Sequence, residues 1–252
     1  MLSIYLANAT ATWPHVLPTV RQLLPARPKV EGSWASAVPT GSKIALAFMI
    51  GIVIVLAVTA TFAESVLLDF DESFYLDRDL REDRDRFGPD WLVWLARPQI
   101  IIPLAILIGL GTIRCRVVAL AFPLAVVAAG ATNVFLGWTV RRERPPFSTH
   151  VGEVNSFPGG HFMQMTLLFG VIPLVAYIVT RRRWVQAVAA VLSAGALALI
   201  LTDTFITGGH WPTDQLAGFL IGASLVVVIW SLTTSGPHHD SCSDCPSQTG
   251  RS

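Results

Sequence analysis

The chain has 252 residues, of which 52% are hydrophobic and only 14% are charged, and its formal net charge is +1. Soluble domains carry roughly 25% charged residues, so this composition excludes an ordinary soluble protein and indicates an integral membrane protein. The nearly balanced charge gives no indication of a nucleic-acid partner, which would need an excess of clustered lysine and arginine.

Residues 1–43 mix proline, threonine, serine and small apolar residues, and we expect an N-terminal cytoplasmic or interfacial leader. Apolar stretches long enough to cross about 30 Å of hydrocarbon follow. The second is the weakest, because Arg97 and Pro98 interrupt it. The stretches lie near residues 44–63, 98–113, 117–138, 161–180, 184–203 and 214–232. They predict an all-α fold, a six-transmembrane helical bundle over 44–232, with a disordered cytoplasmic tail at 233–252.

Lysine and arginine in short loops mark the cytoplasmic side of a membrane protein. They gather before the first stretch, between the second and third, and between the fourth and fifth. This pattern predicts a multi-pass protein of the cell membrane with both termini in the cytoplasm. The loops at 64–97, 139–160 and 204–213 then lie outside. Acids outnumber bases in the first of them, and pairs such as Asp77/Arg81 predict a short solvated helix within 69–86.

Cysteine and metal chemistry add little to this picture. Cys115 lies at the edge of a predicted span, and Cys242 and Cys245 lie in the tail, so a disulfide framework is not indicated. His238 and His239 precede the tail cysteines with some metal-ligand character, but in a segment predicted to be disordered. We therefore expect no metal and no cofactor.

A basic cluster, Arg141-Arg142-Glu143-Arg144, lies on the predicted outer side, where the charge rule would not place it. An anionic substrate would explain this exception. The planar guanidinium group presents a fork of donors that matches phosphate oxygens. Arg141, Arg142 and Arg144 are therefore candidate phosphate-binding residues.

A second outer segment opens the fourth stretch. Gly159 and Gly160 would let backbone N–H groups approach an anion closely. His161 follows them at the expected start of a helix, where unpaired N–H groups also favour anions. We expect this segment to contact phosphate, with His161 able to donate a proton to a departing oxygen.

A third outer segment carries His210 and Asp214, four residues apart, with Pro212 at a plausible first helical position. That spacing lets the carboxylate accept a hydrogen bond from one imidazole nitrogen. The other nitrogen is then left with a lone pair and can attack phosphorus. Each residue alone is more often structural, but their joint order and common membrane side favour a phosphate site.

The motifs resemble those of the type 2 phosphatidic acid phosphatase superfamily, which also includes the vanadium haloperoxidases. The resemblance rests on Arg144-Pro145, on Pro158 to His161, and on His210-x3-Asp214, and it covers roughly residues 44–232. It implies a six-span α-helical core that works without metal. It also implies that Arg144 clamps phosphate, that His161 is the general acid, and that His210 is a nucleophile forming a phosphohistidine, with Asp214 as its partner.

Three positions depart from the family pattern. Gly137 stands where the family has a clamp lysine, Gly159 replaces a serine, and Thr204 replaces an arginine. Losing one preorganised donor to transition-state charge typically costs about a hundred- to a thousandfold in rate. Arg142 is the better candidate to restore the lost charge, because it lies two residues before Arg144 and an extended loop would point both side chains the same way.

The leading interpretation is a membrane phosphatase that hydrolyses a lipid phosphate or prenyl pyrophosphate at the outer face. The substituted clamp leaves a second one open, a weak or inactive family member that binds lipid phosphates or acts as a membrane scaffold. A small-solute transporter is a third, and the low polarity of the spans speaks against it. The sequence indicates the bilayer and a lipid substrate as partners and does not identify the lipid or the oligomeric state.

Overall fold

The computed structural model describes residues 39–74, 94–95, 97–113, 115–146, 155–180 and 182–235, apart from the side chains of 116, 205–207, 234 and 235. They belong to one compact unit, Trp34–Ser252. Most of the predicted leader and tail, and the Asp77/Arg81 pair, lie outside these residues. Cys115 is disulfide-bonded, which the sequence did not indicate, and Cys242 and Cys245 lie outside the described part.

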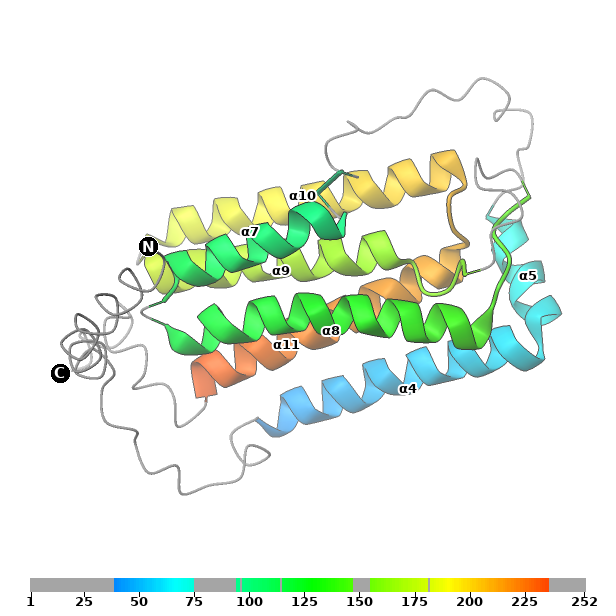
Figure 1. Cartoon of the computed structure of the whole chain (residues 1–252), viewed down its shortest axis with the longest axis horizontal. Helices are drawn as coiled ribbons and strands as arrows, with labels where there is room; N and C mark the ends of the chain where they lie inside the picture. Colours follow the sequence, from blue (N-terminus) through cyan, green and yellow to red (C-terminus); the bar gives the residue numbers. More distant parts are fainter. Residues whose placement is uncertain are drawn as a thin grey trace, which may run out of the picture. The chain divides into compact units, whose positions relative to one another are not determined.

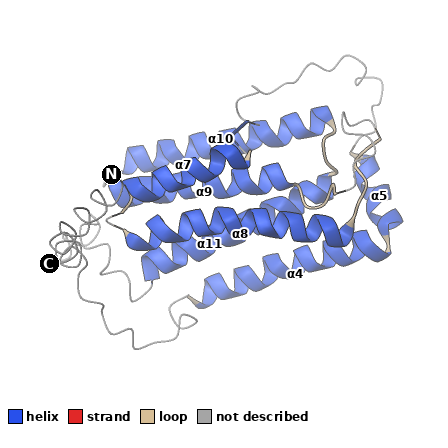
Figure 2. Cartoon of the chain, viewed as in Figure 1, coloured by secondary structure: helices blue, strands red, loops and turns tan. Residues whose placement is uncertain are grey.

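Every regular element in the described ranges is a helix, so the all-α prediction is confirmed (Figures 1 and 2). The helices are α4 (Thr40–Phe62), α5 (Glu64–Ser73), α7 (Pro98–Gly111), α8 (Arg116–Val140), α9 (Gly160–Val179), α10 (Arg183–Thr207) and α11 (Pro212–Ser235). Five of them, α4, α8, α9, α10 and α11, are long and apolar enough to cross a membrane. At 14 residues, α7 rises only about 21 Å, in line with its weak sequence signal.

Helix α9 lies at the centre of the bundle and packs against α8, α10 and α11. Its apolar residues Met163, Leu167 and Leu174 are fully buried. Glycines allow α9 and α11 to approach closely: a Cβ atom on Gly170 would lie 2.5 Å from Val226, and one on Gly222 would lie 2.6 Å from the Met163 carbonyl oxygen. Small residues at helix crossings serve the same purpose in membrane proteins generally.

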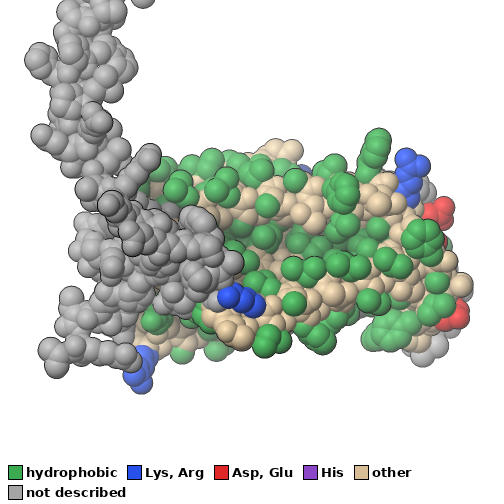
Figure 3. All heavy atoms as spheres, turned by 90° about the horizontal axis from the view of Figure 1, so that it is seen from below, with side chains coloured by type: hydrophobic (Ala, Val, Ile, Leu, Met, Phe, Trp, Pro, Cys, Tyr) green, Lys and Arg blue, Asp and Glu red, His purple; other side chains and the backbone are tan. Residues whose placement is uncertain are grey.

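The outside of the bundle is apolar, as expected for a surface that faces lipid. Phe48, Val55 and Phe62 of α4 are more than half exposed, as are Val191 and Leu192 of α10. Figure 3, which views the bundle from below relative to Figure 1, shows hydrophobic side chains along the helices and acidic side chains at one end. That is the end at which α4 gives way to α5.

The same end of the bundle collects the segments singled out by the sequence. Here α8 ends at Val140, α9 begins at Gly160, and α10 connects to α11 through residues 208–211 (Figure 1). The backbone N–H of Gly159 donates to the Asp214 carbonyl oxygen at 2.8 Å, so the starts of α9 and α11 are joined directly. The fold therefore brings residues from three distant segments to one place.

Candidate active site

The basic cluster after α8 splits into residues that face in different directions. Arg141 ends the helix in the left-handed conformation, with φ of 53°, and its side chain is exposed. Its Nε donates to the Trp138 carbonyl oxygen at 3.3 Å, and its guanidinium lies 5.8 Å from the centre of the Trp138 ring. Arg141 thus lies against the end of its own helix, and its contacts do not include the predicted catalytic histidines.

Arg142 turns inward, and its side chain is 0% exposed. Its Nη2 donates to Asp71 Oδ2 at 2.6 Å, and its Nη1 donates to Asp214 Oδ1 and to Thr213 Oγ1, each at 2.7 Å. Burial disfavours the charged form, but the two carboxylates outweigh it and raise the pKa of Arg142 above its ordinary value. The guanidinium therefore remains a cation that neutralises two buried carboxylates.

This arrangement argues against the prediction that Arg142 replaces the missing phosphate clamp. Both of its amino groups already donate to protein oxygens, and the side chain is closed off from solvent. The spacing of the loop predicted that Arg142 and Arg144 would point the same way. It could not indicate that the inward side was already occupied by acids from α5 and α11.

Asp214 also has partners that the sequence did not predict. In addition to Arg142, its carboxylate accepts hydrogen bonds from the hydroxyl of Ser156 and, at 3.3 Å, from the backbone N–H of Trp211. The sequence predicted that one imidazole nitrogen of His210 would donate to Asp214; in the structure Nδ1 contacts the Ser156 carbonyl oxygen at 2.7 Å. Asp214 thus fixes Ser156, and Ser156 in turn fixes the imidazole.

The contacts of His210 define which nitrogen carries the proton. A carbonyl oxygen only accepts, so Nδ1 must be the protonated nitrogen that donates to Ser156. On the other side, Nε2 lies 3.3 Å from Nη1 of Arg144, and arginine only donates. Both contacts require the same tautomer, with the proton on Nδ1 and the lone pair on Nε2. This is the form that a nucleophilic histidine needs.

Arg144 is the cation of the basic cluster that lies beside this histidine. Its Nη1 also donates to the Gly209 carbonyl oxygen at 2.7 Å, and the side chain is half-buried. The backbone around His210 therefore holds the guanidinium next to Nε2. An anion that reached Nε2 would meet Arg144 at the same time.

Gly159 has a different role from the one predicted. The N–H of Gly159 donates to the Asp214 carbonyl oxygen, so it is committed to joining α9 and α11. A Cβ on Gly218 of α11 would lie 2.4 Å from the Gly159 carbonyl oxygen, which shows how closely the helices meet. Gly160 is packed against Asn133, and His161 is exposed in the first turn of α9.

The glycine that replaces the family lysine also has a structural reason. A Cβ on Gly137 would lie 3.2 Å from Asn155 Cβ and 3.5 Å from the Phe157 carbonyl oxygen. The loop before α9 therefore occupies the space that a longer side chain on α8 would need. Thr204, at the position of the family arginine, donates its hydroxyl hydrogen to the Ile200 carbonyl oxygen of its own helix.

Sequence reasoning missed Asp71, Thr213 and Ser156. Asp71 belongs to an acidic segment that was interpreted as a solvated face, yet its side chain is fully buried. One signal could have found it: Leu67 lies four residues earlier, on the same side of α5, and is buried as well. Among the described residues, no group of three or more His, Cys, Asp or Glu side chains is arranged to hold a metal ion.

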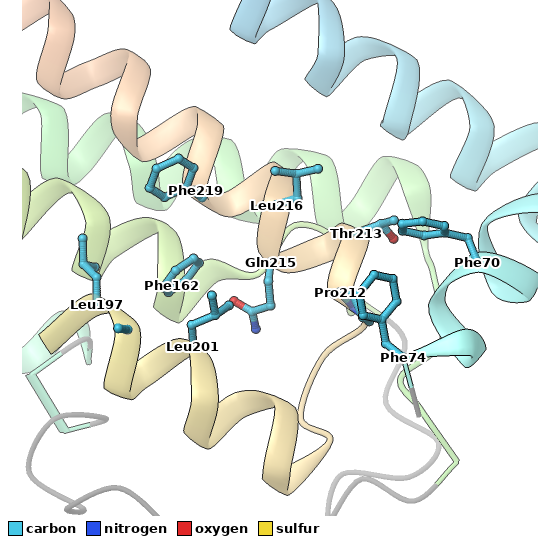
Figure 4. A pocket seen from close by; sticks show the side chains of 11 residues that line it. Phe70, Phe74, Phe162, Leu197, Leu201, Pro212, Thr213, Gln215, Leu216 and Phe219 are labelled. Carbon is cyan, nitrogen blue, oxygen red and sulfur yellow. The ribbon is translucent and has the colours of Figure 1, made fainter. Parts of the chain in front are cut away.

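An apolar pocket of about 420 Å³ opens beside this polar network (Figure 4). Thr213 belongs to both, because its hydroxyl contacts Arg142 and Asp71 while the residue also lines the pocket. The other lining residues come from α5, α9, α10 and α11 and are Phe70, Phe74, Phe162, Leu197, Ala198, Leu201, Pro212, Gln215, Leu216 and Phe219. The volume falls within the range of about 300–1,000 Å³ that is usual for ligand sites.

Comparison with known proteins shows a similar fold and a family match over part of the chain. Residues 118–235 match the family model of the PAP2 superfamily. Over these residues, slightly less than half of the chain, the sequence is similar to the PAP2 superfamily. A crystal structure of a transmembrane PAP2-type phosphatidylglycerolphosphate phosphatase from Bacillus subtilis has a similar fold, with a TM-score of 0.54 and 22% sequence identity. The similarity covers 73% of this chain and 93% of that one. No curated protein sequence matches the chain.

The PAP2 region contains Arg142, Arg144, His161, His210 and Asp214, but it begins after α5. The apolar helices and the similar fold support a multi-pass membrane protein. Asp71, which completes the buried network, lies in the part of the chain that the family model does not cover.

Proposed function

We propose that this protein removes phosphate from a lipid phosphate or prenyl pyrophosphate, with His210 as the nucleophile. The observation that carries the proposal is the environment of the imidazole. Nδ1 is held by the Ser156 carbonyl oxygen at 2.7 Å, and Nε2 lies 3.3 Å from an amino group of Arg144. A nucleophilic nitrogen and a phosphate-binding cation are thereby placed side by side.

The proposed reaction has two steps. Arg144 and N–H groups in the first turn of α9, including that of Gly160, bind the phosphate oxygens. The lone pair of Nε2 attacks phosphorus, and the bond from phosphorus to the lipid oxygen breaks. His161 gives that oxygen a proton. Water then attacks the phosphohistidine, His161 takes up a proton from the water, and inorganic phosphate leaves as Nε2 recovers its lone pair.

The apolar pocket favours a lipid over a soluble phosphate ester. Its walls are almost entirely hydrocarbon, and it begins at Thr213, three residues after His210. A substrate with its phosphate at Nε2 can therefore place a hydrocarbon chain between α5, α10 and α11. Burying that chain supplies affinity for the lipid part of the substrate.

Charge at the two ends of the bundle supports an outer location for the site. Lys43 lies in the first turn of α4, Arg182 precedes α10, and Arg183 is its first residue, all at the end opposite the site. Glu64 and Glu72 belong to α5, at the site end. The Arg141-Arg142-Glu143-Arg144 cluster at the site end is the exception to the positive-inside rule that an anionic substrate would explain. The remaining lysines and arginines make the opposite end cytoplasmic, so the site meets substrate at the outer leaflet of the cell membrane and both termini are cytoplasmic.

A second candidate function is a protein that binds lipid phosphates without efficient turnover. The replaced family cations at Gly137 and Thr204 favour it, because Arg142 does not restore their charge. Both candidates use the same anion site, and they differ in whether a phosphoryl group is transferred to His210.

The experiment measures phosphate release by the purified protein from a panel of lipid monophosphates and prenyl pyrophosphates. Activity that is abolished in His210→Ala, and lowered about a hundred- to a thousandfold in Arg144→Ala, supports the phosphatase. Arg141→Ala is the matched control and should retain full activity. A parent protein that binds these lipids but releases no phosphate would refute the phosphatase and leave the binding function.

A further inference from the structure

Asp71 differs from the other acidic residues of its helix. Asp69 and Glu72 are exposed on α5, whereas the Asp71 side chain is 0% exposed. A buried carboxylate is costly unless cations and hydrogen-bond donors surround it. A solvated helix face would not account for this burial, so Asp71 must have a structural or functional role.

The partners of Asp71 all belong to the active-site end of the bundle. Oδ1 accepts the backbone N–H of Thr213 at 2.9 Å, and Oδ2 accepts the Thr213 hydroxyl and Arg142 Nη2, each at 2.6 Å. Thr213 is the second residue of α11. Backbone N–H groups at this position have no acceptor within their own helix. Asp71 thus caps α11 with a carboxylate that comes from a different helix, where negative charge is also favoured by the helix dipole.

Arg142 connects this cap to the residues around the nucleophile. Its Nη2 contacts Asp71 and its Nη1 contacts Asp214. Asp214 accepts the hydroxyl hydrogen of Ser156, and the carbonyl oxygen of Ser156 fixes His210 Nδ1. A continuous chain of hydrogen bonds therefore runs from α5 to the imidazole.

We propose that Asp71 is a positioning residue for the phosphatase site, docking α5 onto the first turn of α11 and fixing, through Arg142 and Asp214, the Ser156 carbonyl that orients His210. This inference rests on the proposed function, because it concerns the orientation of the nucleophile. The docking also sets a wall of the apolar pocket, since Phe70 of α5 and Phe74, the residue that follows this helix, line that pocket.

The test compares Asp71→Asn with Asp69→Asn, the same substitution two residues away on the exposed face of α5. Asparagine keeps an oxygen for the Thr213 N–H but removes the charge that Arg142 requires. We expect kcat of Asp71→Asn to fall between about tenfold and a hundredfold, as for a nucleophile slightly out of place, while KM for a short-chain lipid phosphate stays within about twofold. Asp71→Glu should recover part of the lost kcat, and Asp69→Asn should match the parent.

A second measurement reports directly which nitrogen of the His210 imidazole carries the proton. Nitrogen-15 NMR of His210 should show the Nδ1-protonated tautomer in the parent and in Asp69→Asn, and a mixture of tautomers in Asp71→Asn. An Asp71→Asn protein with unchanged kcat, or with the parent's imidazole spectrum, would overturn the proposal. If the parent releases no phosphate from any substrate, the proposed function fails, and the spectra alone then decide whether Asp71 positions His210.

Discussion

Replacing Arg142 distinguishes a structural role, in which it neutralises two buried carboxylates, from a role in binding the substrate phosphate. In Arg142→Ala, the side chains of Asp71 and Asp214, both 0% exposed, lose the cation that lies 2.6 and 2.7 Å from them. Removing one partner of a buried ion pair typically costs about 3–5 kcal/mol, because a charge is left buried without compensation. For a chain of 150–250 residues, each kcal/mol lowers Tm by about 2–4 °C, so the expected loss is roughly 6–20 °C.

The assay is thermal unfolding of the purified protein in detergent, followed by tryptophan fluorescence. Arg141→Ala is the matched control, because its side chain is exposed and its loss should change the free energy of unfolding by no more than about 0.5 kcal/mol. If Arg142→Ala unfolds at the same temperature as Arg141→Ala and instead raises KM for lipid phosphate, Arg142 contacts substrate and the reasoning is refuted.

Three other substitutions test separate parts of the structure. Ala198→Trp fills the apolar pocket and should raise KM for a long-chain lipid phosphate about tenfold or more, while KM for a short-chain one stays unchanged. Leu199→Trp, on the exposed side of α10, is the control and should change neither KM. If Ala198→Trp raises both KM values equally, the pocket does not bind the lipid chain. Ser156→Ala removes the hydrogen bond from the Ser156 hydroxyl to Asp214 but keeps the carbonyl oxygen, so kcat should fall about tenfold at constant KM. An unchanged kcat would show that Asp214 does not orient His210 through Ser156. Gly218→Ala forces a Cβ against the Gly159 carbonyl oxygen and should lower the free energy of unfolding by about 1–3 kcal/mol. Gly51→Ala, whose Cβ meets nothing within 4 Å, should not destabilise the protein. Equal stability of the two variants would argue against the close approach of α9 and α11.

The helices could be predicted well because each is an apolar run bounded by polar residues, glycine or proline. The stretch predicted at 161–180 is α9, Gly160–Val179, and the one predicted at 214–232 is α11, Pro212–Ser235. Lipid solvation imposes these lengths locally, so no tertiary contact is needed to recognise them. The weak second stretch is also the shortest of the apolar helices.

The chemistry of individual side chains could be predicted less well. His210 and Arg144 were identified from motif order, and the structure places them in contact. The pairing of Asp71 with Arg142 spans 71 residues. In its own segment Asp71 looks like an ordinary solvated charge, and Arg142 looks like a residue that binds phosphate. The Ser156 carbonyl that orients His210 has no sequence signature at all, because every residue carries one.

The most direct test of the account is the chemical form of a trapped phosphoenzyme. The protein is mixed with a lipid phosphate, quenched under conditions that preserve phosphohistidine, and digested, and the His210 peptide is examined by mass spectrometry and phosphorus-31 NMR. The contacts of His210 predict phosphate on Nε2, because Nδ1 is occupied by the Ser156 carbonyl. Phosphate on Nδ1, or lipid phosphate hydrolysed with no phosphate ever found on His210, would contradict it.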